Sequence, residues 1–412
     1  MRIAFLSTSE ATGGAAVVTR RTAEALRRLG HDARMVVLRR DKNINTSFVE
    51  TVSDKNLFRL LPFVVERVEI FLQNGLNRRD LWKVSTASTG VPVFAHPFVA
   101  KADIIVIGWI CQGFLSLAEI EQICAIGKPV VMVMHDQWAM TGICHLPGAC
   151  RKWTDGQQCG SCPMLHCMSG KHDLSWRVWN RKRALLQNTP GMKFVAVSTW
   201  LASRAKESSL LCDRDVTVIP NPIFLPPPDD IPLRRKPVIA MGAARLDDDV
   251  KNLPLAIKAL NMLHSDGRVP NAEVVFFGGL RDRNALSSLR MPHRWVGPLI
   301  QDEVSRLMRE CKVVLSTSHF EMLPTTLVEG LANGCVAIAT DSGGQRDIID
   351  DGVNGRLISP GDARGLADAL AWSLSNKAPE APELRRSVEK FNADSVSRRY
   401  LQLFESFDCQ SV

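Results

Sequence analysis

Two glutamates, Glu321 and Glu329, stand with seven residues between them in a stretch whose residue types could bind a polar ligand. Residues 313–318 and 335–340 are short apolar runs of the kind that is buried in parallel sheets. Residues 324–333 lie between these runs, begin with a proline and precede a glycine, which predicts a helix. The stretch therefore predicts a βαβ unit with Glu321 at the carboxyl end of a strand, where open α/β sheets bind ligands.

The start of the predicted helix adds a second binding feature. Leu323, Pro324 and Thr325 lie there, and the free backbone N–H groups of a helix N-terminus can hold an anion or sugar hydroxyls. Glu329, further along the same helix, can accept hydrogen bonds from a diol such as ribose. A solvated surface carboxylate explains either glutamate when it is read alone, so the interpretation depends on the rest of the chain.

Two cations follow another predicted strand. Arg245 and Lys251 come after the apolar run 238–243, at the same kind of strand end as Glu321. The pair suits a diphosphate, because arginine binds phosphate through two parallel hydrogen bonds and lysine binds it as a point charge. Surface charge explains either cation alone, and the sequence offers no explanation for the three aspartates at 247–249.

The first half of the chain contains a similar arrangement. A strand predicted over residues 2–8 is followed by Gly13 and Gly14 at a strand-to-helix turn. The turn lacks G-x-G-x-x-G, which counts against a dinucleotide oxidoreductase. His135 ends a further predicted strand, 129–135, where a histidine either contacts a ligand or has a purely structural role. A mere tight turn explains the glycine pair nearly as well as a binding role.

The combination resembles the donor-binding signature of family-4 retaining glycosyltransferases of the GT-B fold. The E-x7-E pair, the Leu-Pro before the helix, the DSGGQRDII turn and the R-x5-K spacing carry this resemblance. It implies an α/β protein of two doubly wound, Rossmann-like domains facing a cleft, and a UDP- or GDP-sugar donor. The implied roles are phosphate binding by Arg245 and Lys251, ribose binding by Glu329, contact with the donor sugar by Glu321 and His135, and backbone approach to the donor at Gly13, Gly14, Leu323, Pro324 and Thr325.

The chain departs from the family pattern at three positions. Ala244 and Asn252 stand where glycines usually precede the Arg and follow the Lys, and Pro324 stands where many relatives carry glycine. The donor sugar can therefore not be read from the sequence. No D-x-D pair ends a strand in the first half, so catalysis is expected to require no divalent metal or other cofactor.

Four cysteines, Cys144, Cys150, Cys159 and Cys162, follow a C-x5-C-x8-C-x2-C pattern. Four thiols that end in C-x-x-C permit a structural tetrahedral zinc site, with free thiols or an oxidation-prone pair as the alternatives. The segments HDQWAMTGIC and CGSCPML resemble a subgroup of the same family, in colanic-acid, exopolysaccharide and lipopolysaccharide biosynthesis, that carries a similar insert. We assign this insert to residues 144–167.

The length of 412 residues exceeds one ordinary core and predicts two domains. The proline-rich tract 224–237 is the clearest linker. We assign residues 1–222 to an N-terminal, acceptor-side domain and residues 223–382 to a nucleotide-sugar-binding domain. Residues 383–412 are expected to form a final helix that, in this fold, crosses back to the first domain.

Residues 54–84 are apolar with interspersed arginines and lysines. They fit either an amphipathic helix on an anionic membrane or an ordinary helical hairpin, and Pro62 and Gly75 are expected to interrupt them. No apolar run reaches the ~18 residues of a spanning helix, and the N-terminus lacks a signal-peptide pattern. We therefore expect a cytoplasmic protein, peripheral on the inner face of the membrane if the amphipathic interpretation is right.

The net charge of +8 suits anionic partners, among which nucleic acid is least favoured because aromatic residues are not interleaved with the basic ones. The sequence predicts a hexosyltransferase-type enzyme that moves a sugar, with retention, to a glycan or lipid-linked glycan in exopolysaccharide, capsule or lipopolysaccharide biosynthesis. A GT-B nucleotide-sugar epimerase or phosphorylase is the alternative with the same fold. A non-catalytic, zinc-bearing nucleic-acid-binding protein is the alternative of another class. The acceptor, the linkage and the oligomeric state stay open.

Overall fold

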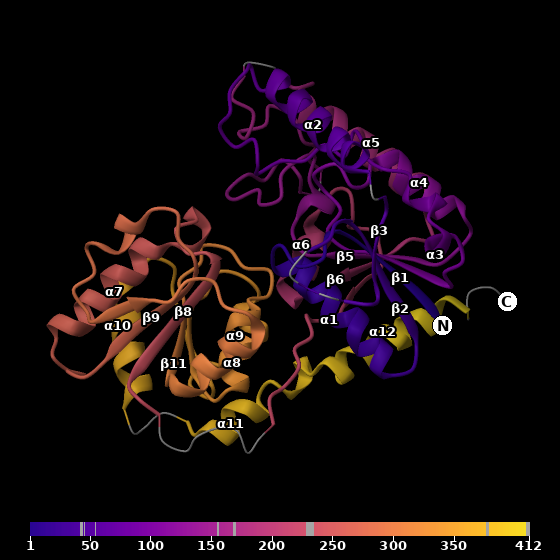
Figure 1. Cartoon of the computed structure of the whole chain (residues 1–412). Coiled ribbons are helices and arrows are strands. Elements are labelled where there is room, and N and C mark those ends of the chain that lie inside the picture. Colours follow the sequence, from indigo (N-terminus) through magenta and orange to yellow (C-terminus); the bar gives the residue numbers. More distant parts are fainter. Residues whose placement is uncertain are drawn as a thin grey trace. The chain divides into compact units, whose positions relative to one another are not determined.

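The computed structural model describes residues 1–41, 44, 46–53, 55–154, 156–167, 170–227, 235–375 and 379–408. The chain divides into two compact units (Figure 1). Unit 1 consists of Met1–Pro220 and Ser397–Val412, and unit 2 consists of Asn221–Val396. Residues 228–234, the middle of the tract expected to be a linker, lie outside the described residues.

Unit 1 is built on a seven-stranded parallel sheet in the order β3-β2-β1-β4-β5-β6-β7. Its strands are β1 (Arg2–Ser9), β2 (Asp32–Arg39), β3 (Val49–Thr51), β4 (Ile104–Ile107), β5 (Val130–Met134), β6 (Lys193–Ala196) and β7 (Val216–Val218). Successive residues of β1, such as Ile3, Phe5 and Leu6, are buried on both faces, as expected of a central parallel strand. The chain order reverses between β1 and β4, so the switch point of the sheet lies there.

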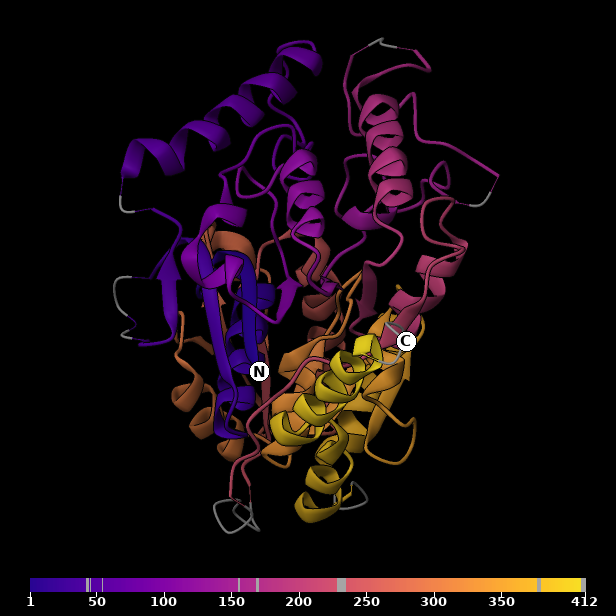
Figure 2. The same cartoon turned by 90° about the vertical axis from the view of Figure 1, so that its right-hand side faces the viewer.

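Helices cover this sheet, and Figures 1 and 2 show α2, α4 and α5 beyond one end of it, away from α1 and α12. The helices are α1 (Gly14–Arg28), α2 (Asn56–Gln73), α3 (Pro97–Ala100), α4 (Leu117–Ala125), α5 (Leu174–Asn188), α6 (Thr199–Glu207) and α12 (Ala393–Asp408), with short 3-10 turns η1 (Val93–Ala95) and η2 (Trp138–Met140). Most of α12 belongs to unit 1, where Lys193 donates a hydrogen bond to the Ser406 hydroxyl at 2.7 Å.

Unit 2 contains a six-stranded parallel sheet in the order β10-β9-β8-β11-β12-β13. Its strands are β8 (Val238–Arg245), β9 (Glu273–Gly279), β10 (His293–Trp295), β11 (Val313–Ser316), β12 (Val336–Thr340) and β13 (Gly355–Ile358). Its helices are α7 (Leu253–Ser265), α8 (Gln301–Glu310), α9 (Thr325–Ala332), α10 (Ala363–Leu374) and α11 (Ala381–Arg386), with 3-10 turns η4 (Asp249–Lys251), η5 (Arg283–Leu286), η6 (Gly344–Asp347) and η7 (Glu389–Phe391). The chain order reverses between β8 and β11, which places the loops after these two strands at the switch point.

The two Rossmann-like sheets confirm the predicted α/β class. The βαβ unit opened by residues 313–318 consists of β11, α9 and β12. Pro324 is the residue before α9 and not its first residue, and Gly334 has φ +83 after the helix end. That left-handed conformation favours glycine and explains why the helix stops there.

Two expectations about helices are wrong. Residues 383–408 form the end of α11, the turn η7 and α12 instead of one continuous helix. Asn392 interrupts the helical segment, because its backbone is extended (φ −57, ψ 134) and its side chain accepts a hydrogen bond from the Asp394 N–H.

The hairpin alternative for residues 54–84 is also wrong: a single helix, α2, continues through Pro62 and ends before Gly75. No helix in the described part of the chain is long and apolar enough to span a membrane.

Candidate functional site

The loops after β8 and β11 bring two of the predicted residues into direct contact. Lys251 Nζ lies 2.5 Å from Glu321 Oε1, and the Ser318 hydroxyl donates to the same oxygen at 2.8 Å. Both charged side chains are partly exposed, with 28% of the Lys251 side chain and 18% of the Glu321 side chain accessible. A cation and a carboxylate therefore meet at the switch point of the unit 2 sheet, within reach of a ligand from solvent.

Backbone interactions hold these two loops together. The Thr317 hydroxyl donates to the carbonyls of Lys251 (2.9 Å) and Asn252 (3.1 Å), and the His319 N–H donates to the Val250 carbonyl at 2.8 Å. Asn252 has φ 52, a left-handed conformation that asparagine tolerates better than most residues. This tolerance explains how asparagine fits where the family usually has glycine.

Gly343 brings the turn after β12 against the loop of Glu321. A Cβ atom on Gly343 would lie 2.1 Å from the Glu321 carbonyl oxygen, so only glycine fits without displacement of the backbone. The Gly344 N–H donates to the same carbonyl at 2.8 Å. The glycine pair therefore fixes the main chain of Glu321 through its carbonyl group.

Arg245 ends β8 and is engaged by the aspartates for which the sequence offered no explanation. Its Nη2 lies 2.6 Å from Asp248 Oδ2, while Asp248 Oδ1 caps the turn η4 through the Val250 N–H at 3.1 Å. Asp247 accepts the N–H groups of Arg281 (3.1 Å) and Asp282 (3.0 Å). Burial by itself would raise the pKa of Asp247, but these N–H donors keep it below its usual value. The aspartates thus shape the loop that carries Arg245 and Lys251.

The remaining predicted residues of unit 2 lie on or before α9. Leu323 is buried, Pro324 precedes the helix, and Thr325 opens it with its side chain half-buried. Glu329 lies in the second turn of α9 and is half-buried. The described contacts bring Lys251 and Glu321 together, and they leave the role of Glu329 as a prediction.

In unit 1, three predicted residues line one cavity of about 230 Å³ at the switch point between β1 and β4. On one side Gly13 precedes α1 and Gly14 is its first residue, and on the other side His135 follows β5. Gly13 has φ 90, so its conformation favours glycine, whereas a side chain at Gly14 would meet open space. The cavity is therefore large enough for a sugar-sized ligand. The exposed backbone of Gly13 and Gly14 forms one side of it.

His135 lines this cavity as a neutral imidazole. Burial lowers its pKa to about 4, against the opposing effect of the Asp136 charge. A neutral ring can donate one hydrogen bond and accept another, which suits contact with hydroxyl groups.

Asp136 lines the same cavity as His135 and belongs to a network that the sequence did not reveal. Its Oδ2 accepts from Trp109 Nε1 at 2.8 Å and lies 2.7 Å from His145 Nδ1, while His145 Nε2 lies 3.1 Å from the Ser85 hydroxyl. Burial would raise the pKa of Asp136, but His145 and the N–H groups of Trp138 and Trp109 lower it. The only sequence signal for His145 was its place beside Cys144 in the insert.

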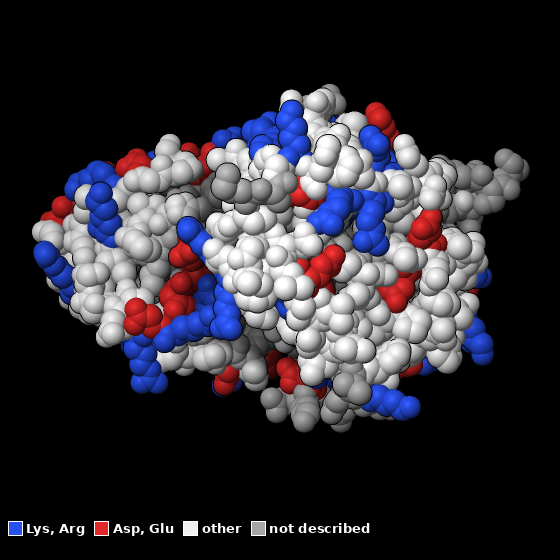
Figure 3. Space-filling model, turned by 90° about the horizontal axis from the view of Figure 1, so that it is seen from above, with Lys and Arg blue, Asp and Glu red and all other residues white. Residues whose placement is uncertain are grey.

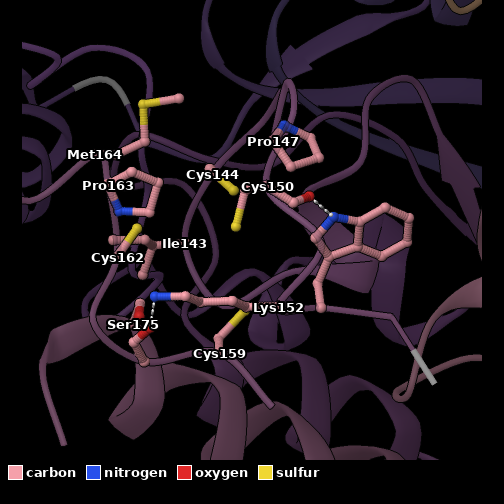
Figure 4. A pocket seen from close by; sticks show the side chains of 12 residues that line it. Ile143, Cys144, Pro147, Cys150, Lys152, Cys159, Cys162, Pro163, Met164 and Ser175 are labelled. Carbon is pink, nitrogen blue, oxygen red and sulfur yellow. Dashed lines mark hydrogen bonds between the residues drawn. The ribbon is translucent and has the colours of Figure 1, made fainter. Parts of the chain in front are cut away.

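The four cysteines of the insert line a second, smaller cavity of unit 1, of about 20 Å³ (Figure 4). Cys144 and Cys159 are buried, Cys150 and Cys162 are half-buried, and all four are free thiols. The pattern that suggested a shared site thus does place the four side chains around one space.

Sequence comparison connects this geometry to a known family. The profile described as "Glycosyltransferase Family 4" matches residues 12–225, just over half of the 412 residues, and the profile "Glycosyl transferases group 1" matches residues 229–393. The chain belongs to glycosyltransferase family 4. Membership excludes the non-catalytic nucleic-acid-binding alternative and confirms the family to which the motifs pointed.

Curated relatives of this glycosyltransferase act on different substrates. Phosphatidyl-myo-inositol mannosyltransferase of Mycolicibacterium smegmatis is 28% identical over 206 residues, which are 47% of this chain and 52% of that protein. Lipopolysaccharide 1,6-galactosyltransferase of Escherichia coli is 38% identical over 95 residues, 23% of this chain and 25% of that protein. The matched parts span about half the length of these relatives or less.

Solved glycosyltransferase structures share the GT-B fold with this chain. HepE of Anabaena, crystallised with UDP and glucose, aligns with a TM-score of 0.61 at 16% identity, over 98% of this chain and all of that chain. Sucrose-phosphate synthase of Thermosynechococcus elongatus aligns with a TM-score of 0.62 at 16% identity, over 99% of both chains. At this level of identity the likeness shows the fold alone.

Proposed function

We propose that this family-4 glycosyltransferase moves a hexose from a nucleoside diphosphate sugar to a glycan acceptor with retention of configuration. The observation that carries the proposal is the contact between Lys251 and Glu321 at the switch point of unit 2, where the loop of Lys251 also carries Arg245. Two cations suit the two phosphates, and a carboxylate suits sugar hydroxyls. A pathway of exopolysaccharide, capsule or lipopolysaccharide biosynthesis stays a prediction from the resemblance.

Transfer of this kind needs fixed charge more than a proton donor. When the sugar–phosphate bond breaks, negative charge develops on the departing diphosphate, and positioned cations stabilise it without reorganisation. When the donor binds, Lys251 would leave its ion pair with Glu321 and bind the phosphates. Glu321 could then accept hydrogen bonds from the donor sugar. Glu329 is proposed to hold the ribose, and the cavity at His135 is proposed to hold hydroxyls of a sugar.

A thermal-shift series tests the donor. Because HepE was crystallised with UDP-glucose, we expect UDP and UDP-sugars to raise the melting temperature more than GDP and GDP-sugars. A ligand present at 100 times its dissociation constant stabilises the fold by about 2.7 kcal/mol. If no nucleotide shifted the melting temperature, the donor assignment would be wrong. Product analysis with labelled UDP-glucose then separates a transferase from an epimerase or a phosphorylase.

A lipid-linked acceptor is favoured by the outer face of α2. Phe58, Leu61, Val65, Val68 and Leu72 recur at intervals of three and four residues, and each is 42% to 57% exposed. Such a stripe normally faces a protein core. Figure 3 looks onto this end of unit 1 and shows a broad area broken by only a few charged residues.

The buried side of the same helix carries Glu66 and Arg67 as well as Ile70, whereas the apolar stripe faces outward. Glu66 is fully buried, lies 2.9 Å from Arg67, and accepts the N–H groups of Thr86 (2.8 Å) and Ala87 (3.0 Å). These bonds hold α2 to unit 1 with its apolar side outward. We propose that this side binds an anionic membrane surface, which places the active site near a lipid-linked acceptor.

Basic side chains at the end of α2 add attraction to anionic lipid. Arg78, Arg79 and Lys83 are exposed there, next to Trp82, whose side chain is 59% exposed. Each basic residue near an anionic surface contributes about 1 kcal/mol, and salt weakens this attraction. The exposed Trp82 suits the membrane interface, where tryptophan is enriched.

We expect the protein to sediment with phosphatidylglycerol vesicles, and Leu61→Glu combined with Val68→Glu to reduce this binding at least tenfold. Ile300→Glu in unit 2 is the matched control, because Ile300 is 68% exposed and outside the α2 face. Binding that is equal for all three proteins, or equal on uncharged phosphatidylcholine vesicles, would contradict the proposal. Donor hydrolysis in the absence of lipid should be the same in all three.

A further inference from the structure

The cysteine cavity of unit 1 has features of a metal site that the glycosyl transfer does not use. Cys144, Cys150, Cys159 and Cys162 come from separate loop positions and surround one space of about 20 Å³ (Figure 4). A volume of roughly 10 to 15 Å³ is enough for one water molecule or an ion of similar size. The other lining side chains are mostly apolar, so a water molecule there would find few partners.

Hydrogen bonds hold the loops that surround the cavity. The Gly142 N–H donates to Cys159 Sγ at 3.2 Å, and the Met164 N–H donates to Cys162. Lys152 crosses one side of the cavity and donates to the carbonyls of Gly160 (3.1 Å) and Ser161 (2.6 Å), which fixes the C-x-x-C turn. These bonds keep the loops that carry Cys159 and Cys162 beside the cavity.

The backbone of the C-x-x-C turn is also unusual. Ser161 has φ 44, and a Cβ atom on Gly160 would lie 2.3 Å from the Lys171 carbonyl oxygen. Residues that keep such conformations need surrounding structure that holds them. Lys152 and the Ser161 N–H bond to the Gly170 carbonyl, at 3.1 Å, hold this turn, and an ion bound by the four sulfurs would add to that support.

We propose that Cys144, Cys150, Cys159 and Cys162 bind one zinc ion as four thiolates and that this site fixes the insert 144–167. Binding replaces four thiol protons by one Zn²⁺ ion, so four protons are released and no electron is transferred. Among the described residues, no three Cys, His, Asp or Glu side chains lie close enough together to hold an ion. The sulfurs must therefore move inward on binding, which Cys150 and Cys162 can do because they lie in half-exposed loops.

The proposed ion would also support the cavity at His135. The backbone of Cys144 forms an antiparallel β-bridge with Val84. Cys144 immediately precedes His145, whose Nδ1 lies 2.7 Å from Asp136 Oδ2. The Gln137 N–H donates to the His145 carbonyl at 3.0 Å, so the backbone ties the insert to the end of β5 as well. His145 is a positioning residue in this arrangement, and zinc acts on the cavity only through it.

Metal analysis of protein that is purified without chelator tests the site directly. We expect about one zinc ion per chain, and less than a tenth of that in Cys150→Ser and Cys162→Ser. Cys124→Ser on α4 is the matched control, because Cys124 is half-buried in unit 1 and lies outside the cavity. Zinc content that is unchanged in both cavity variants would overturn the proposal.

Cobalt substitution keeps the test valid if the variants fail to fold. Wild-type protein that is stripped by a chelator and titrated with Co²⁺ should develop the sulfur-to-cobalt charge-transfer bands and strong visible bands of a tetrahedral thiolate site, complete at one equivalent. Chelation should lower the melting temperature, and added Zn²⁺ should restore it. A spectrum of octahedral Co²⁺, or disulfides among these four cysteines in the freshly purified protein, would show that the cluster is not a zinc site. Failure of the donor assignment would leave these results unaffected.

Discussion

Lys251→Ala is expected to weaken binding of the nucleoside diphosphate by about 10- to 150-fold. A hydrogen bond to a charged group contributes about 1.5 to 3 kcal/mol, and each 1.4 kcal/mol is a factor of ten. The loss should fall at the upper end of this range, because the variant also leaves the Glu321 carboxylate, 2.5 Å from Lys251 Nζ in the wild type, without its cation beside the phosphates. Calorimetric titration of UDP into the variant measures the effect.

Arg245→Ala should have a smaller effect in the same titration. Glu321 is expected to turn from Lys251 to the donor sugar, whereas Asp248 also caps η4 and therefore keeps its ion pair with Arg245, at 2.6 Å, when the phosphates bind. Lys258→Ala is the matched control, since Lys258 lies exposed on α7 of the same unit. The phosphate assignment fails if Lys251→Ala and Lys258→Ala bind UDP equally well while both melt like the wild type.

Glu321→Gln and Glu329→Gln should separate turnover from binding. Glu321 lies where charge develops, at the proposed donor sugar, so its replacement should reduce turnover by about 10²-fold. UDP affinity should be unchanged or slightly higher, because Lys251 loses the partner that competes with the phosphates. Glu329 is proposed to bind the ribose equally in the ground state and the transition state, so Glu329→Gln should mainly weaken UDP binding.

Steady-state turnover and UDP titration on both variants decide between these roles. Equal profiles, or loss of UDP affinity in Glu321→Gln with turnover intact, would mean that the two glutamates do not divide the work in this way. The family assignment would survive that result, since it depends on the sequence profiles and not on the roles of two residues.

Periodicity and strand-end position were enough to predict the fold and much of the unit 2 site. Buried parallel strands read as continuous apolar runs, and a doubly wound sheet places ligands at the carboxyl ends of its strands, so Arg245, Lys251 and Glu321 could be expected near one another. The short edge strands β3, β10 and β13 escaped this reasoning, because three or four residues carry too little pattern to distinguish a strand from a loop.

Other features were decided only by the tertiary structure. The sequence of α2 reads as amphipathic, but it does not say which face turns inward. That choice is made by Glu66, which pairs with Arg67 and with backbone N–H groups twenty residues away. The same holds for Asp136, whose network joins Trp109, His145 and Ser85 from separate segments.

The sequence by itself therefore determined the two α/β units, the family and the residue types at the candidate donor site, because these depend on local pattern and on spacing within one βαβ unit. Only the tertiary structure decided that Lys251 is paired with Glu321, that Asp248 holds Arg245, and that four cysteines share one cavity. The physical reason is that these contacts depend on the backbone geometry of the loops, within one loop for Arg245 and Asp248 and between loops for the others, as the left-handed Asn252 and the close contact at Gly343 show. Spacing along a chain does not encode that geometry.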